Sequence, residues 1–323
     1  MSYYFARKMQ RELNVPIGII SANWGGTGAE CWTPAEKMKD NVVLKNIYAR
    51  WEKWNLEYKS DSISFLQAKK INPKLEEPKS VYMMTRPHRR PSVLYNAMVN
   101  PLIPYTIKGA IWYQGTSNRD WANEYLEQMK ALIYGWRERW TIGNFPFYFL
   151  QLTCFKYSDS NMAAIIRENQ LKTLEVENTA MCPTMDIGDL NELHVTYKLP
   201  YGERLANIAL AKTYGKQVPF CGPLFQEAKI KGNKIEVQFK YGQGLHYNGK
   251  ILNDIFIAGA DKKFVKATAV IENEKLIVSS TEIKKPISAR YAWNNTGSAN
   301  LFNKDNLPAS PFRTDSWENI SIE

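Results

Sequence analysis

The residues best suited to acid–base chemistry lie in the stretch NELHVTYK, residues 191–198. His194 is one of only three histidines among 323 residues. A histidine that takes a proton from a hydroxyl group, beside a carboxylate that orients its ring, forms the central pair of a serine hydrolase. Glu192 and Asp189 are the carboxylates next to it in the sequence. His194 is therefore the predicted general base, with Glu192 or Asp189 as the orienting carboxylate.

Such a hydrolase also needs a nucleophile and hydrogen-bond donors for the oxyanion. The stretches WGGTG (24–28) and YQGTSN (113–118) supply candidate donors, namely glycine amides and two side-chain amides. The nucleophile is harder to find, because the sequence contains no G-x-S-x-G elbow. Ser21 and Ser117 follow predicted strands and either could face the histidine. A hydroxyl that bonds to local backbone is the commoner state for both serines.

The candidate residues follow short apolar runs that alternate with amphipathic segments. The opening residues predict a helix that ends at Asn14, before Pro16. Strands alternating with helices favour an open, mostly parallel sheet, in which chemistry collects at the carboxyl ends of the strands. The predicted strands are 15–21, the apolar part of 101–114, 145–152 and 180–189, and the later helices are 125–140, 166–177 and 202–216.

The periodicity divides the chain into two predicted domains. Residues 1–219 read as the α/β domain, with an aromatic, lysine-rich helical insertion at about 36–90. The insertion's aromatic residues are predicted to serve packing. Beyond 219 the segments KIEVQF, NEKLIVSS and ISARYAW alternate apolar and polar residues between turn signals, which predicts an antiparallel β domain over 220–323.

Composition argues against several functional classes. The formal charge is +10, but the basic residues are scattered among 32 acidic ones and form no stripe, so nucleic-acid binding is not expected. No run of about 18 apolar residues predicts a membrane span, and no basic-then-apolar leader opens the chain. The four cysteines lack the spacing of a disulfide framework or a zinc site, so no metal and no cofactor are expected.

Several blocks, taken in order, resemble the bacterial sialate O-acetylesterase family, which are SGNH-type hydrolases of carbohydrate acetyl esters. The blocks are SANWGGTGAECW, RPSVLYNAMVNPLIPYTIKGAIWYQGTSN, FPFYFLQL, RENQ, DIGDLNELHVTYK with GERLA, and NLFNKDNLPASPFRTD. The resemblance implies a flavodoxin-like core, an acetylated sugar or glycan as partner, no cofactor, and export to the periplasm or beyond. It also implies His194 as the base, and the oxyanion or substrate-binding residues Gly25, Gln114, Gly115, Asn118 and Arg167.

The sequence departs from the family pattern at the nucleophile. The family carries its serine in a GQSN block on a first strand upstream of the opening helix, and this sequence contains no such block. We therefore expect that this sequence begins internally, without that strand, and that the chain has little catalytic turnover. Thr116, Glu192 and Val195 also stand where the family has Glu, Asp and Pro.

Two alternatives to an impaired esterase follow from the missing block. One is a non-catalytic relative that binds glycans, and the other is recruitment of Ser21 or Ser117 as the nucleophile.

Two further features concern the charge of the ligand and the environment of a second histidine. Arg86, Arg89 and Arg90 could pair with the carboxylate of an acidic sugar, although a solvated charge cluster is commoner. His88 is predicted to be a solvated loop residue.

Overall fold

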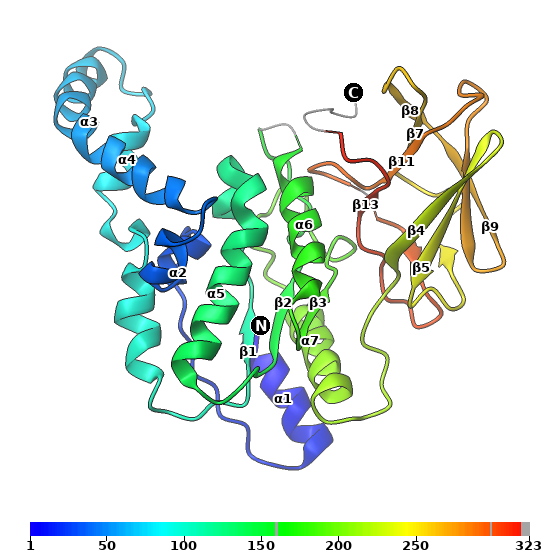
Figure 1. Ribbon diagram of the computed structural model, residues 1–323, viewed down its shortest axis with the longest axis horizontal. Coiled ribbons are helices and arrows are strands. Elements are labelled where there is room, and N and C mark those ends of the chain that lie inside the picture. The colour runs from blue at the N-terminus through cyan, green and yellow to red at the C-terminus, as the bar shows by residue number, and fades with distance from the viewer. Residues whose placement is uncertain (159–160, 298, 318–323) are drawn as a thin grey trace. The chain divides into compact units, whose positions relative to one another are not determined.

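The computed structural model describes residues 1–158, 161–297 and 299–317 (Figure 1). The chain divides into two compact units. The first unit comprises residues 1–21, 109–113 and everything from 146 onward, and the second comprises 22–108 and 114–145. Each unit therefore contains segments that are far apart in the sequence, and each is treated separately below.

The first unit contains a three-stranded parallel sheet. Strands β1 (Ala110–Trp112), β2 (Phe147–Leu150) and β3 (Thr179–Cys182) lie in the order β1-β2-β3. All of β2 and β3 is buried, as expected for parallel strands that are covered on both faces. The structure thus confirms three predicted strands and their parallel arrangement. The finer assignment to a flavodoxin-like core stays a prediction.

Two helices of the first unit pack together beside this sheet. They are α1 (Ser2–Leu13) and α7 (Leu199–Lys212). A side chain at Gly202 would come within 2.6 Å of Tyr4 Cβ, so this glycine permits the close approach of the two helices. Helix α1 ends at Asn14, whose φ of 53° is the left-handed conformation of a helix C-terminus, as predicted.

The prediction of a buried strand at 15–21 was wrong. The segment is in neither a helix nor a strand, and Val15, Ile19 and Ile20 are 45%, 45% and 47% exposed. A β-strand is stabilised by hydrogen bonds to a neighbouring strand and by burial of its side chains. None of the described strands pairs with this segment. The apolar sequence alone therefore does not make it a strand.

In the described part of the chain, the rest of the first unit consists of one α-helix and ten antiparallel strands. Helix α6 (Met162–Lys172) begins and ends earlier than predicted and is followed by a 3₁₀ turn. The strands form sheets in the orders β4-β5-β10-β9, β13-β11-β7-β8 and β12-β6. The strand bounds are β4 (Leu224–Lys231), β5 (Lys234–Lys240), β6 (His246–Tyr247), β7 (Ile255–Ala258), β8 (Phe264–Lys266), β9 (Thr268–Glu272), β10 (Lys275–Ser279), β11 (Ser288–Tyr291), β12 (Leu301–Phe302) and β13 (Phe312–Arg313).

The antiparallel sheets share one apolar core. Its fully buried members include Val237, Ile257, Leu276 and Tyr291, which come from four different strands. The alternating segments of the sequence thus form antiparallel strands, and each buries one of its faces in this core. A domain boundary near 219 stays a prediction.

The second unit is helical. Its α-helices are α2 (Ala35–Lys39), α3 (Lys45–Ile71), α4 (Lys79–Met84) and α5 (Tyr125–Trp140). The 3₁₀ helix η1 (Ala29–Trp32) follows the WGGTG stretch, and the 3₁₀ helix η5 (Thr116–Glu124) begins within YQGTSN. Trp51 and Trp54 of α3 are buried with Met38 and Leu44, which confirms the predicted packing role for these two aromatic residues, whereas Tyr58 is exposed.

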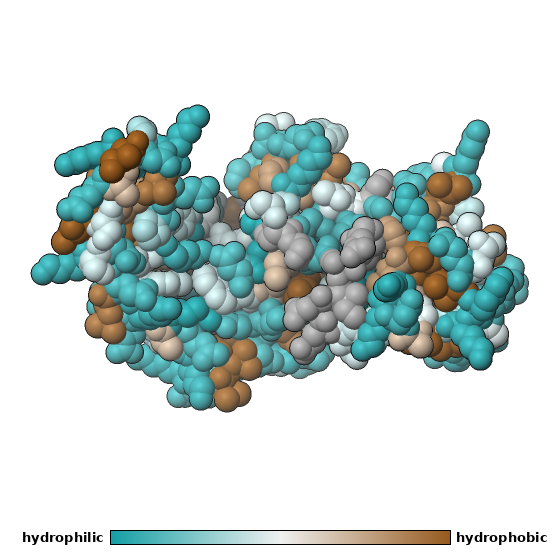
Figure 2. All heavy atoms as spheres, turned by 90° about the horizontal axis from the view of Figure 1, so that it is seen from above, coloured by the Kyte–Doolittle hydropathy of each residue, from teal (hydrophilic) through white to brown (hydrophobic). Residues whose placement is uncertain are grey.

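Hydrophilic side chains cover much of the face seen in Figure 2, where apolar side chains form separate small patches. Within the described ranges, no helix combines the length and the apolar character needed to cross a lipid bilayer.

Candidate active site

Two of the predicted oxyanion segments lie together in the second unit. The backbone N–H of Ala29 donates to Asn118 Oδ1 over 2.9 Å, and Gln114 Nε2 donates to the Thr27 carbonyl over 3.1 Å. These bonds join residues 89 and 87 positions apart. The chain after WGGTG is therefore fixed to the YQGTSN turn through side-chain amides.

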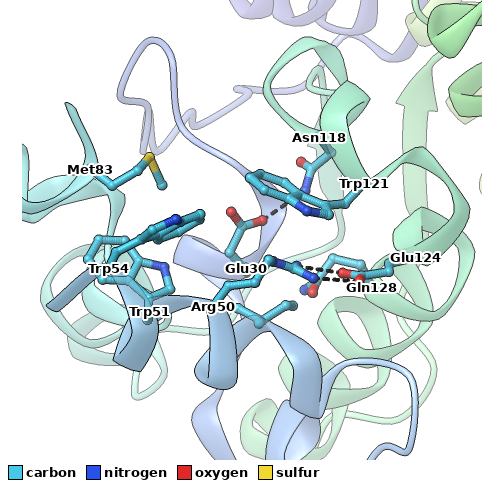
Figure 3. A pocket seen from close by; sticks show the side chains of 10 residues that line it. Glu30, Arg50, Trp51, Trp54, Met83, Asn118, Trp121, Glu124 and Gln128 are labelled. Atoms are coloured by element: carbon cyan, nitrogen blue, oxygen red, sulfur yellow. Dashed lines mark hydrogen bonds and ion pairs between the residues drawn. The ribbon is translucent and has the colours of Figure 1, made fainter. Parts of the chain in front are cut away.

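Asn118 is the centre of this network and is only 6% exposed. Its Oδ1 also accepts from Gln114 Nε2 (2.7 Å), and its Nδ2 donates to Glu30 Oε2 (2.8 Å; Figure 3). Gln114 Oε1 accepts from the Tyr125 hydroxyl over 3.0 Å. Both amide groups thus have a defined orientation. In this arrangement Gln114 Nε2 directs its two hydrogens at protein acceptors, so the amide holds the loop in place.

Glu30 is a buried acid that sequence reasoning missed. Its side chain is 8% exposed, and burial raises the pKa of the carboxyl above the usual 4.5, against the opposing effects of the Asn118 hydrogen bond and Arg50. A Cβ at Gly28 would overlap the Glu30 carboxylate. A glycine two positions before an acid, in the otherwise uncharged stretch GTGAECW, is the signal that the sequence offered.

A small cavity lies beside Glu30 in the second unit. Its wall contains an indole cluster, Trp51, Trp54 and Trp121, together with Arg50 and Glu124 (Figure 3). Arg50 binds both carboxylate oxygens of Glu124, at 2.6 and 2.7 Å, and its guanidinium lies 4.5 Å from the ring centre of Trp121. The cavity volume of about 10 Å³ accommodates about one water molecule. A sugar does not fit there.

The WGGTG turn exposes the first predicted oxyanion donor. Gly25 is exposed, its N–H bonds to no described residue, and no atom lies within 4 Å of where a Cβ would be. Gly26 has φ +72°, a conformation that favours glycine. Thr27 fixes the turn, because its hydroxyl donates to the Trp24 carbonyl and accepts from Trp32 Nε1. Gly115 lies in the facing turn and accepts from the Asn118 N–H over 3.0 Å.

An aromatic and cationic surface flanks this turn. The Trp24 ring is 51% exposed and stacks on His88, with ring centres 5.2 Å apart. The Arg89 guanidinium lies against Gly26, since a Cβ there would be 2.7 Å from Nη2. His88 is partly exposed, and its stacking on Trp24 is a contact that the sequence did not predict. Burial, together with Arg89 and Arg86, lowers the His88 pKa below 6.5 and favours the neutral ring.

His194 lies in the first unit, on an exposed turn. Glu192 Oε1 accepts from the backbone N–H of His194 over 2.8 Å, and Asp189 Oδ1 accepts from the backbone N–H of Asn191 over 2.7 Å. Both carboxylates thus stabilise the backbone of the turn, as short polar side chains often do. No described residue hydrogen-bonds the His194 imidazole. Orientation of the ring by Glu192 stays a prediction.

Arg167, on α6 of the first unit, is fully buried. Its guanidinium donates to the carbonyls of Leu152 (2.7 Å), Thr153 (3.0 Å), Asn294 (2.6 Å) and Asn295 (3.0 Å). Burial lowers its pKa to about 10, which leaves it a cation at neutral pH. The structure gives Arg167 the role of joining the segment after β2 to the segment after β11. A direct contact with substrate stays a prediction.

The remaining candidates are placed as follows. Ser21 is exposed at the end of the first unit's opening segment, and Ser117 is half-buried in η5 of the second unit. Within the described ranges no three or more His, Cys, Asp or Glu side chains converge in a way that could hold a metal ion.

Comparisons with known proteins agree with the blocks seen in the sequence. The family "carbohydrate esterase, sialic acid-specific acetylesterase" matches residues 83–211. The sialate O-acetylesterase of Mus musculus is 26% identical over 96% of this chain, and that of Pongo abelii is 28% identical over 90%. The crystal structure of a carbohydrate acetylesterase from Xanthomonas citri matches 98% of this chain with a TM-score of 0.80 and 34% identity.

The matches cover only part of each relative. The chain spans 62% of the mouse protein, 55% of the Pongo abelii protein and 65% of the Xanthomonas citri chain. Matched residues include the YQGTSN turn, Arg167 and the His194 turn within 83–211. Over most of its length the chain is thus similar to carbohydrate acetylesterases, the sialate O-acetylesterases among them.

Proposed function

We propose that this protein hydrolyses O-acetyl esters of sialic acid or a related acetylated glycan by a serine-type acyl transfer, with His194 as the base. The main observation behind the proposal is that hydrogen bonds join the WGGTG and YQGTSN turns. This network fixes the backbone around the exposed Gly25 amide. Donors fixed in advance are what stabilises the oxyanion of an acyl-transfer transition state.

The chemistry assigns one role to each part. A serine hydroxyl attacks the acetyl carbonyl while His194 takes its proton, and Gly25 N–H donates to the developing oxyanion. The bond between the acyl carbon and the sugar oxygen then breaks, and His194 returns the proton to that oxygen. Water, deprotonated by His194, attacks the acyl-enzyme, the bond between the acyl carbon and the serine oxygen breaks, and His194 returns the proton to the serine as acetate leaves. Glu192 keeps the His194 turn in shape through the backbone N–H.

The surface beside Gly25 favours an acidic sugar as the acetylated substrate. The exposed face of Trp24 can stack on the apolar C–H face of a sugar ring, and Arg89 can bind a carboxylate. Arg86 is less available, because its Nη1 pairs with Glu77 over 2.9 Å. We therefore assign discrimination between acidic and neutral sugars to Arg89, and expect Arg89→Ala to raise KM for an acidic sugar ester selectively.

The presence or absence of a nucleophile determines the rate at which the 323-residue chain alone can release acetate. Because the sequence has no GQSN block, we expect little acetate release by this chain, and a loss of nucleophile of this kind costs on the order of a millionfold in rate. The test compares acetate release from O-acetylated sialic acid by this chain and by the same chain preceded by a strand that carries GQSN.

Each outcome of that comparison separates the alternatives. Activity in the extended protein alone supports the proposal. Equal activity in both proteins means that the nucleophile lies within the 323 residues, and alanine at Ser21 or Ser117 then identifies it. Saturable sugar binding with no acetate release from either protein favours a non-catalytic glycan-binding relative.

A further inference from the structure

We propose that Glu30 is a positioning residue that sets the direction of the amide network beneath the Gly25 turn. The inference rests on the proposed function, because that turn is the proposed oxyanion donor. Glu30 itself is too deeply buried to touch a sugar, and it contacts Asn118, which contacts Gln114.

The argument begins with what each group can donate or accept. An ionised carboxylate only accepts hydrogen bonds, whereas the amide of asparagine or glutamine can be turned over to exchange donor and acceptor. With Glu30 ionised, Asn118 must present Nδ2 to Glu30 Oε2. Its Oδ1 then faces the N–H of Ala29 and the amide of Gln114.

The same logic fixes the next amide. Because Asn118 presents an acceptor, Gln114 must present Nε2, which also reaches the Thr27 carbonyl. Gln114 Oε1 is then left to accept from the Tyr125 hydroxyl. Thr27 in turn holds the Trp24 carbonyl on the far side of Gly25. The direction of every bond from Glu30 to the Gly25 turn is therefore set jointly by the Glu30 carboxylate, the Ala29 N–H and the Thr27 carbonyl.

Burial of this acid calls for an explanation beyond packing. A buried carboxylate is unfavourable unless a cation or several donors compensate it. The charged groups that face Glu30 are Arg50 on α3 and Glu124 on η5, but these two bind each other, and within the described residues Glu30 makes no ion pair. Cys31, its neighbour in η1, has a pKa raised by burial and is a neutral thiol. A glutamine would fill the space without a charge, but it could also donate, so it would no longer oblige Asn118 to present Nδ2.

Protonation of Glu30 is thus expected to release the network. A protonated carboxyl can donate to Asn118, which allows the asparagine amide to turn over. The raised pKa of Glu30 moves this event from the ordinary glutamate range towards neutral pH. Mild acid should then loosen the Gly25 turn.

The experiment reads the network directly by nitrogen-15 NMR of side-chain amides, assigned by their loss in Asn118→Ala and Gln114→Ala. In the wild-type chain both amide signals should shift together with pH, at a midpoint above 4.5. Glu30→Gln should abolish that titration, and Glu30→Leu should collapse the separate signals of both amides through exchange. Glu127→Gln is the matched control, because Glu127 binds Asn41 and Lys130 in the same unit and does not touch Asn118.

Kinetics of the active form supply the second readout. Glu30→Leu should lower kcat by about 100-fold, as loss of an oxyanion donor does, with KM little changed. Glu30→Gln should retain a higher kcat than Glu30→Leu. It should also lose the fall in kcat in mild acid that we expect from protonation of Glu30. A wild-type Asn118 signal that is constant with pH, or that titrates equally in Glu30→Gln, overturns the inference. If no form releases acetate but the amides titrate as described, the proposed esterase function fails and the role of Glu30 in the network stands.

Discussion

The proposed oxyanion segments and the proposed base differ in burial and in the range of the hydrogen bonds that stabilise them. The Gln114–Asn118 network of the second unit is buried and joins residues 87 to 89 positions apart. The His194 turn of the first unit is exposed, and the bonds that its carboxylates Asp189 and Glu192 accept join residues two positions apart. Long-range bonds in a buried site form only when the whole unit folds, whereas local bonds on an exposed turn are easily exchanged with water.

This difference follows from what each part has to do. Oxyanion donors act best when they are already in position, since reorganising them in the transition state raises the barrier. A general base has to move a proton between three oxygen atoms in turn, and it gains its final geometry once those atoms are present. We therefore expect substitutions in the network to change stability and rate together, and substitutions in the turn to change rate alone.

The largest stability effect is expected from Asn118→Ala. The change leaves the Ala29 N–H and the Glu30 carboxylate without their partner in a buried site, which costs about 3 kcal/mol of unfolding free energy. The matched variant is Asn191→Ala in the His194 turn, where the side chain meets only Lys156 at an exposed position, and it should change stability by less than about 0.5 kcal/mol. Urea unfolding measures both. Equal losses would contradict the contrast between the two regions.

Gly28→Ala should have the next largest effect. The new methyl group would overlap the Glu30 carboxylate and push it away from Asn118, at a cost of about 2 kcal/mol. If the overlap is the cause, adding Glu30→Ala should recover much of that loss, because the obstructing side chain is gone. Full additivity of the two changes in a double-mutant cycle would mean that Gly28 is required for another reason.

The pH dependence of stability should have opposite signs at two buried acids. Burial raises the Glu30 pKa above 4.5, so the folded state holds the proton more tightly and the unfolding free energy falls as pH rises from 4.5 through that raised value. At Asp315 burial acts to raise the pKa, but Arg290 and Ser288 outweigh it and hold the pKa below 3.8, so its contribution is lost as pH falls below that value.

Unfolding free energies measured across pH test these signs. Glu30→Gln should remove the fall on the alkaline side of pH 4.5, and Asp315→Asn should remove the fall on the acid side of pH 3.8. A Glu30→Gln protein whose curve stays parallel to that of the wild type throughout would show that Glu30 titrates normally.

The smallest effect is expected at Glu192. Glu192→Gln keeps an acceptor for the His194 N–H, so the unfolding free energy should change by less than about 0.5 kcal/mol. The rate should also fall only slightly if the carboxylate serves the backbone alone. A large fall in kcat with unchanged stability would instead favour the prediction that Glu192 orients the imidazole.

The sequence predicted those parts of the fold that depend on local pattern. The end of α1 at Asn14, the strands β1 to β3 and the alternating segments after 219 all follow from periodicity and turn signals. It failed at 15–21, because a strand depends on a neighbour that no local pattern reveals. It missed Glu30 for the same reason, since the partner that gives this acid its role lies 88 residues away.

Acetate release from O-acetylated sialic acid by the GQSN-extended protein and its His194→Ala variant tests the central claim most directly. The account predicts that the variant loses activity by at least about a thousandfold, while its unfolding free energy stays within about 0.5 kcal/mol of the parent because the turn is exposed. Acetate release at the parental rate by His194→Ala would contradict the assignment of His194 as the base.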